Sequence, residues 1–125
     1  MKFVGRIDRE IYRCVTPDIR TDEVIITEER IEHIQQRHPN DYERYFTLFG
    51  EMIAKPDYIL MSDRANTAFV LKEMIQEGER FQMIIRLAVS GDPRDRLNSV
   101  ITFLRIDEKR YRRYLRTKKI LYKSE

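Results

Sequence analysis

Both histidines of the chain lie in one short segment, Arg30-Ile-Glu-His33-Ile-Gln-Gln-Arg37-His38-Pro39. The unperturbed pKa of histidine lies nearest neutrality, so this side chain is the most frequent proton donor or acceptor in catalysis. The sequence contains one cysteine and no glycine-rich phosphate loop. The histidine segment is therefore the main place at which this chain could house proton transfer near neutral pH.

The segment that contains both histidines should be helical. Thr27 is suited to be the N-cap, and the helix should run to about His38 because Pro39 disfavours helical geometry at the residue before it. Ile31, Ile34 and His38 fall on one face, so His38 should end the apolar stripe and point toward a sheet. The C-terminus of a helix stabilises a protonated imidazole, as a general acid requires. The alternative for His38 is a buried, hydrogen-bonded ring that only packs.

His33 lies about 140° around the helix from His38, on a face that it shares with Glu29 and Arg37. The alternative for His33 is a solvated surface side chain. Zinc-binding histidine pairs of this kind need four-residue spacing on one face. The spacing therefore predicts no metal site, and we expect no cofactor. Cys14 has no second cysteine with which to form an intrachain disulfide.

Residues 109–123 carry eight lysine and arginine side chains and no acidic one. Such cations contact phosphate backbones, and interleaved tyrosines offer rings on which bases can stack. The alternative is a solvated helix face. Lys72 on a predicted strand is a further phosphate contact, or else a strand lysine that faces solvent. The candidate nucleic-acid contacts are Lys72, Arg112, Arg113, Arg116, Lys118, Lys119 and Tyr122.

The composition is that of a compact globular domain, with 125 residues of which 42% are apolar and 36% are charged. We expect one domain spanning residues 1–125. The longest apolar runs fall far short of the roughly 18 residues that span a bilayer, and the N-terminal residues lack the character of a signal peptide. These features predict a cytoplasmic protein that does not associate with membranes.

Alternation and turn composition predict the order of the elements. A second helix should begin at Asn40, which forms a capping box with Glu43, and end near Lys55. Asp107 should cap a basic helix that reaches about Arg116. The predicted extended segments are a hairpin at 3–7 and 11–15, a short run at 23–26, four strands at 57–62, 68–75, 80–89 and 97–106, and a strand or tail at 120–122.

Four consecutive strands with short links favour an antiparallel meander. The predicted fold class is therefore α+β, with N-terminal helices packed on one face of a four-stranded antiparallel sheet, an N-terminal hairpin and a basic C-terminal helix. Strand alternation places Arg86, Asn98 and Thr102 on one polar surface and Ser99 on the opposite side. An arginine in a central strand needs a partner or a ligand, so Arg86 is a candidate for anion binding.

Three motifs in this order resemble the phage and mobile-element branch of the barnase, EndoU, colicin and RelE (BECR) group of ribonucleases. The resemblance covers about residues 22 to 123. Members of this group have N-terminal helices on a four-stranded antiparallel sheet. They are known or predicted to be metal-independent ribonucleases, and many act as toxins or effectors. The motifs are Val24-Ile-Ile-Thr-Glu-Glu-Arg-Ile-Glu-His33-Ile-Gln-Gln-Arg-His38-Pro, Ile53-Ala-Lys-Pro-Asp-Tyr-Ile59 and Asn98-Ser-Val-Ile-Thr-Phe103.

The resemblance implies that His33 and His38 belong to the matching helix motif, and that Ser99 and Thr102 belong to the matching late strand. Arg86 would be a strand cation that meets phosphate. The implied partners are an RNA substrate and an immunity or antitoxin protein.

The combined hypothesis is a metal-independent endoribonuclease that uses attack by the 2′-hydroxyl. His38 is the predicted principal acid or base, and His33 its partner or a substrate contact. Arg86 would stabilise phosphate, while Ser99 or Thr102 would donate a hydrogen bond to a nonbridging oxygen. One alternative is an RNA-binding module without catalysis. Another is a protein-interaction component of a mobile element that uses a tyrosine-rich face formed by Tyr42, Tyr45 and Tyr114.

Overall fold

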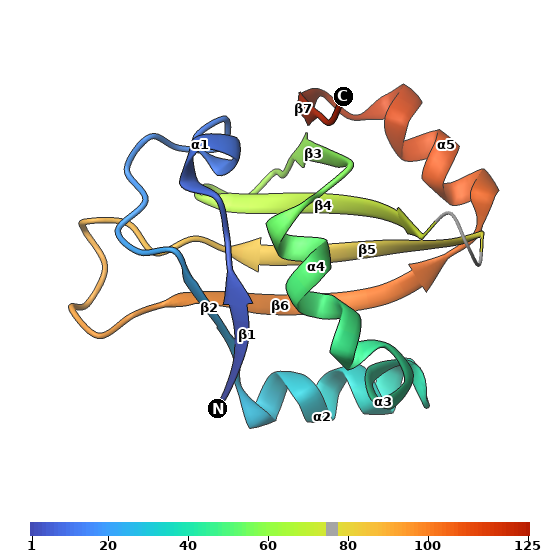
Figure 1. Ribbon diagram of the computed structural model, residues 1–125, viewed down its shortest axis with the longest axis horizontal. Helices are drawn as coiled ribbons and strands as arrows, with labels where there is room; N and C mark the ends of the chain where they lie inside the picture. The colour runs from blue at the N-terminus through green and yellow to red at the C-terminus, as the bar shows by residue number, and fades with distance from the viewer. Residues whose placement is uncertain (75–77) are drawn as a thin grey trace.

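The computed structural model describes residues 1–74 and 78–125 (Figure 1). The strands are β1 Lys2–Arg6, β2 Glu23–Ile26, β3 Tyr58–Met61, β4 Thr67–Met74, β5 Glu79–Arg86, β6 Asn98–Ile106 and β7 Ile120–Lys123. The helices are α1 Arg9–Tyr12, α2 Glu28–Arg37, α3 Asp41–Tyr45, α4 Phe49–Ala54 and α5 Glu108–Thr117, with a 3₁₀ turn, η1, at Phe46–Leu48. None of the helices in these ranges combines the length and hydropathy needed to cross a bilayer.

The predicted four-stranded antiparallel sheet is wrong. The seven strands form one sheet in the order β1-β2-β6-β5-β4-β3-β7. The pairing of β2 with β6 is parallel and the other pairings are antiparallel, so the sheet is mixed. The short strands β1, β2 and β7 extend it because strands distant in sequence pair at its edges, which alternation within one segment does not reveal.

The predicted N-terminal hairpin is also wrong, because residues 11–15 do not form a strand. The Asp8 side chain accepts a hydrogen bond from the Glu10 backbone N–H at 2.9 Å and caps the short helix α1. This local capping bond favours helix over strand at the site. Strand β1 instead pairs with β2, where Phe3 lies opposite Ile25.

The second predicted helix is divided into α3, η1 and α4. Asn40 has a left-handed backbone with φ of 72°, and its side chain makes no capping hydrogen bond. The predicted capping box with Glu43 therefore does not form. Tyr42 and Tyr45 are buried in the main core, so they cannot present the tyrosine-rich face that the protein-interaction hypothesis requires.

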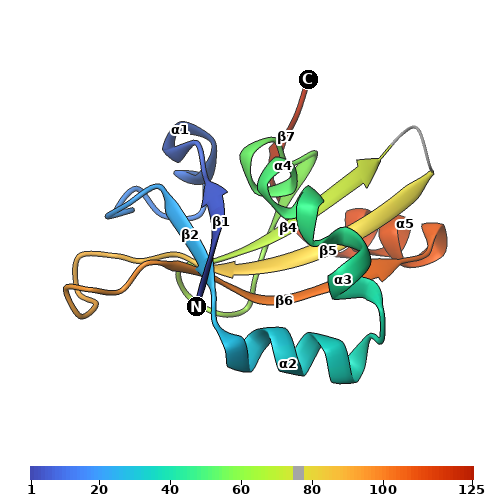
Figure 2. The same cartoon turned by 60° about the horizontal axis from the view of Figure 1, so that its bottom comes forward.

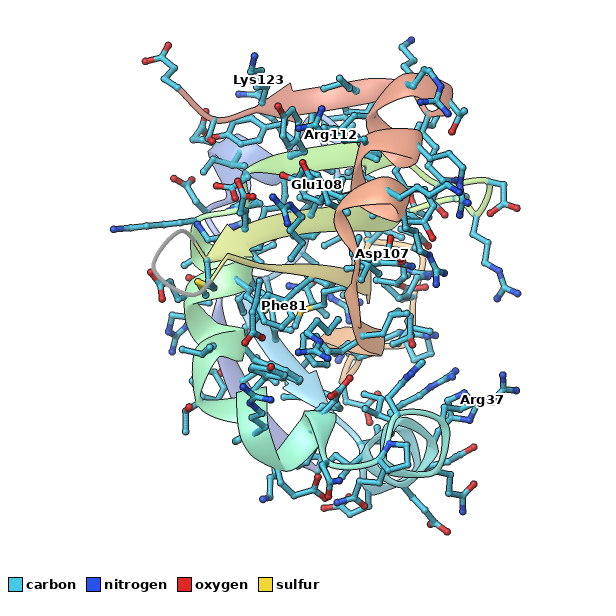
Figure 3. The ribbon with its side chains drawn as sticks, turned by 90° about the vertical axis from the view of Figure 1, so that its right-hand side faces the viewer. Arg37, Phe81, Asp107, Glu108, Arg112 and Lys123 are labelled. Atoms are coloured by element: carbon cyan, nitrogen blue, oxygen red, sulfur yellow. The ribbon has the colours of Figure 1, made fainter. Side chains whose placement is uncertain are left out.

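Helices cover both faces of the sheet, whereas the sequence predicted one covered face (Figures 1 and 3). The larger core lies under α1, α3 and α4 and includes Tyr12, Phe49 and Phe103. The smaller cluster lies on the other face, where Tyr111 of α5 packs with Leu71 of β4. Helix α2 runs beside β6 (Figure 2). Because α5 covers only part of its face, the rest of that face is open to a ligand.

Buried tyrosines make the fold sensitive to alkaline pH. The Tyr12 hydroxyl donates to the Ile53 carbonyl at 2.7 Å, and burial raises the pKa of Tyr12 far above its ordinary value. Burial also raises the pKa of Tyr111. A raised pKa in the folded state contributes stability that is fully present below the unfolded value of about 10 and is lost as the pH rises toward the folded value.

We therefore expect the free energy of unfolding to fall above about pH 10. A Tyr12→Phe variant should lose about 1–3 kcal/mol at pH 7, since the Ile53 carbonyl loses its donor, and should show a weaker alkaline decline. Urea denaturation between pH 7 and 11 measures both quantities. An alkaline slope that is equal in the two proteins would contradict the role of Tyr12.

Candidate active site

A hollow of about 540 Å³ opens on the α5 face of the sheet. Five of the side chains that line it are cationic and one is a carboxylate, so its net charge attracts anions such as phosphate. The cations come from separate parts of the chain, namely α2, the turn between β3 and β4, β5, the loop after β5 and the residues after α5. The lining residues are Arg30, Ser62, Asp63, Arg64, Ala65, Thr67, Phe69, Ile84, Arg86, Arg96, Ile101, Thr102 and Lys118.

A β-bulge in β6 brings Ile101 to this hollow beside Thr102. Opposite β5, Ile84 pairs with Thr102 and Ile85 pairs with Val100, which leaves Ile101 as the extra residue. A bulge of this kind re-aims the side chains on one side of a strand. Ile101 and Thr102 therefore both line the hollow, in place of the simple alternation predicted from sequence.

The same bulge changes the predicted position of Ser99. Ser99 lies directly opposite Arg86 in the register of β5 and β6, and such partners project from the same face of a sheet. Ser99 and Thr102 thus share a face, where uninterrupted alternation would separate them. Asn98 does not join this surface, because its buried amide donates to the Thr21 and Glu23 carbonyls at 2.8 and 3.0 Å.

Arg86 lines the hollow and is held by Asp92. Two guanidinium nitrogens donate to the two Asp92 carboxylate oxygens at 3.0 Å each, and a hydrogen bond to the Leu87 carbonyl adds a third restraint. The Val89 backbone N–H and then the Arg86 guanidinium lower the pKa of Asp92. The sequence predicted that Arg86 needs a partner or a ligand; the structure shows the partner, and the pair fixes the guanidinium at the wall of the hollow.

Arg20 organises the loop that carries Asp92 and Arg96. Its guanidinium donates to the backbone carbonyls of Asp92, Pro93 and Arg96 at 3.0, 2.7 and 2.6 Å. The Asp18 carboxylate accepts hydrogen bonds from the backbone N–H and the hydroxyl of Ser90. The segment before β2 therefore determines where the loop between β5 and β6 places its charged side chains.

Removing the Arg20 clamp should destabilise the fold. We expect Arg20→Ala to lower the free energy of unfolding by about 2 kcal/mol, since several carbonyls lose a charged donor. The matched control is Arg13→Ala, an exposed arginine whose ion pair with Glu10 is also exposed and should contribute less than about 0.5 kcal/mol. Urea denaturation of both variants is the measurement. Equal losses would show that Arg20 does not clamp the loop.

The two histidines have different surroundings. His33 is exposed and lines a shallow hollow of about 260 Å³ on α2, and Arg30 belongs to both this hollow and the larger one. His38 is half-buried at the C-cap of α2, where its backbone N–H donates to the Ile34 carbonyl at 2.8 Å. His38 lines neither of these two hollows. His33 thus lines a hollow that shares Arg30 with the cationic hollow, whereas His38 lines neither.

The residues predicted to contact nucleic acid lie in different parts of the structure. Lys118 lines the hollow and lies over the Phe69 ring, with its Nζ 4.9 Å from the ring centre. Lys72 lies on the opposite face of the sheet, where its Nζ donates to the Lys55 carbonyl at 2.7 Å and pairs with Asp57 at 3.4 Å. Tyr122 packs against the main core.

The remaining predicted cations lie on the outside of the molecule. Arg112, Arg113 and Arg116 of α5 and Lys119 after it are exposed. Arg112 pairs with Glu108 at 2.6 Å, and both are labelled on α5 in Figure 3. These four cations can extend a positive surface beyond the hollow, but they do not line it.

Four charged residues of the hollow were not singled out from the sequence, namely Arg30, Asp63, Arg64 and Arg96. Arg30 comes from α2, Asp63 and Arg64 come from the turn between β3 and β4, and Arg96 comes from the loop after β5. Turn composition marked the two loops, but it carries no information on which loops meet. Within residues 1–74 and 78–125, no group of three or more histidine, cysteine, aspartate and glutamate side chains is arranged to hold a metal ion.

The site can therefore bind an anion on a positively charged wall, with hydroxyl groups and one carboxylate close by. Comparison of the chain with curated proteins and with solved structures gives no match. A family model described as phage-Barnase-EndoU-ColicinE5/D-RelE like nuclease2 (PBECR2) matches residues 2–123. The chain belongs to this family of BECR-type nucleases.

Proposed function

We propose that the chain is a metal-independent endoribonuclease and that RNA is cleaved at the cationic hollow. The observation that carries the proposal is the convergence of Arg30, Arg64, Arg86, Arg96 and Lys118 around one hollow in a chain of a nuclease family. Preorganised cations of this kind stabilise the negative charge that develops on a phosphate in the transition state.

In the proposed reaction the 2′-oxygen attacks the adjacent phosphorus and the bond from phosphorus to the 5′-oxygen breaks. A base removes the 2′-hydroxyl proton and an acid protonates the departing 5′-oxygen, which leaves a 2′,3′-cyclic phosphate and a 5′-hydroxyl. Arg86 stabilises the pentacoordinate phosphate. Thr102 and Ser99, which share its face of the sheet, donate hydrogen bonds to nonbridging oxygens.

Helix α2 supplies the proposed imidazole. His33 is the favoured group because it lies one helical turn from Arg30, which belongs to the walls of both hollows. His38 is the second candidate, since it ends the same helix. The exposed cations Arg112, Arg113, Arg116 and Lys119 would hold backbone that extends beyond the hollow.

The test is incubation of the purified protein with single-stranded RNA and with tRNA in the presence of EDTA. We expect fragments that end in a 2′,3′-cyclic phosphate, and no cleavage of an RNA whose 2′-hydroxyls are methylated. Fragments that appear only when a divalent cation is added would overturn the metal-independent mechanism. Intact RNA under every condition would overturn the enzymatic proposal itself.

A second candidate function is RNA binding without cleavage. It is favoured by one observation, namely that neither imidazole lines the larger hollow. This function predicts RNA affinity that falls steeply with salt concentration, because each neutralised phosphate releases counterions. It also predicts that no product forms with any RNA.

A further inference from the structure

We infer that the floor of the hollow binds one unstacked nucleobase, so that the ligand of this site is single-stranded RNA. The inference rests on the proposed function in that it takes RNA as the ligand. It adds which part of the nucleotide the floor contacts and which form of RNA can reach it. We use the word floor for the larger apolar side chains of the lining, which are Phe69, Ile84 and Ile101.

Ile101 provides the main evidence for an apolar surface in the hollow. It is the extra residue of the bulge in β6, it is only half-buried, and it is a member of neither apolar cluster within the described residues. An isoleucine at the centre of a sheet ordinarily packs into a core. Here its apolar surface instead lines a hollow to which five cationic side chains also contribute.

The neighbouring floor residues adjoin the smaller apolar cluster. Ile84 pairs with Thr102 across the strands and packs at the border of the smaller apolar cluster. Phe69 belongs to the same cluster, and its ring packs edge-on against Tyr114 with ring centres 5.0 Å apart. Phe69 is only 7% exposed and Lys118 lies over its ring, so Ile84 and Ile101, which are half-buried, supply most of the open apolar surface.

A nucleotide matches this combination of apolar and cationic lining. Its base has apolar faces that gain from leaving water, and its phosphate lies one sugar away and carries the negative charge. Ile84 and Ile101 offer the apolar surface, while Arg86 and Arg96 offer the cations. A free inorganic anion would use the cations and leave the apolar floor in water.

The stacking and pairing of bases determine which forms of RNA can use this floor. The volume of the hollow, about 540 Å³, falls in the range of sites that enclose a small molecule, roughly 300–1,000 Å³. In a double helix both faces of each base are stacked and the edges are paired, so a base cannot lie on the floor until it leaves the helix. Single strands, loops and bulges present bases without that requirement.

Binding of a 2′-O-methylated oligonucleotide, measured by fluorescence anisotropy, separates this inference from cleavage because the oligonucleotide cannot react. We expect the single strand to bind at least about tenfold more tightly than the same sequence in a duplex. An abasic site placed at successive positions should weaken binding about tenfold at one position. The matched variants are Ile101→Ala in the floor and Ile120→Ala, an isoleucine of β7 that is 42% exposed and does not line the hollow.

Ile101→Ala should weaken binding of the single strand about fivefold and leave duplex binding unchanged, whereas Ile120→Ala should change neither. Equal binding of single strand and duplex, or indifference to every abasic position, would overturn the inference. If single strands bind with the expected sensitivity but no RNA is cut, the inference stands and the catalytic proposal fails. Urea denaturation of both variants verifies that each is folded.

Discussion

An His33→Ala variant should cleave RNA about 100-fold to 10,000-fold more slowly than the unmodified protein, which is the usual contribution of a positioned acid or base. His33 is exposed on α2 and lies beside Arg30, a residue of the larger hollow. Removing an exposed side chain should leave the folded state nearly as stable. The loss should therefore appear in kcat and not in the midpoint of urea denaturation.

The matched variant is His38→Ala, which removes the other imidazole from the same helix. Because His38 lines neither hollow, its loss should slow cleavage by a much smaller factor. If His38→Ala is instead the inactive variant, the sequence-based assignment of His38 as principal acid or base is supported and the favoured role of His33 is wrong. If both variants keep full activity, imidazole catalysis is excluded and proton transfer must involve another group of the hollow, such as Asp63.

An Arg86→Ala variant should lose about 100-fold to 1,000-fold in cleavage rate, as expected when one preorganised donor to the transition state is removed. The two hydrogen bonds that the guanidinium donates to Asp92 fix its direction. Asp92 keeps its charge at neutral pH, since the Val89 N–H and Arg86 lower its pKa. The lowered pKa adds stability above the unfolded value of about 3.9, and this stability is lost as the pH falls through the folded value.

Two further variants separate chemistry from structure at Arg86. Arg86→Lys keeps the positive charge but loses the planar fork that bonds both Asp92 oxygens, so it should recover only part of the activity. Arg13→Ala removes an arginine that does not line the hollow and should leave cleavage unchanged. The measurement is the single-turnover rate at saturating RNA. A fully active and folded Arg86→Ala protein would remove Arg86 from the mechanism.

The sequence alone determined those features that depend on residues close together in the chain. Thr27 caps α2 by accepting from the Arg30 N–H at 3.2 Å, and Asp107 caps α5 by accepting from the Arg110 N–H at 2.7 Å. Such bonds join groups three residues apart, so residue type and spacing predict them. The motifs of residues 24–39, 53–59 and 98–103 likewise indicated the family.

Only the tertiary structure decided how the sheet is extended and how β6 is paired. Strand β2 lies parallel to β6, more than seventy residues later in the chain. The bulge at Ile101 then places Ile101 and Thr102 together in the lining of the hollow, to which Ser99 does not belong. Strand pairing and register follow from the total burial of both faces and not from the alternation of any one strand, so no single segment of the sequence contained this information.

The hollow is the clearest case of that difference. The sequence singled out Arg86, Thr102 and Lys118 by type, but the helix, turn and loop that bring Arg30, Arg64 and Arg96 beside them are far apart in the chain. Charge composition shows that cations are available, and local patterns show on which elements they lie. Their convergence around one hollow depends on long-range packing and on the Arg20 contacts with the loop after β5, because only a folded chain brings these elements within reach of one phosphate.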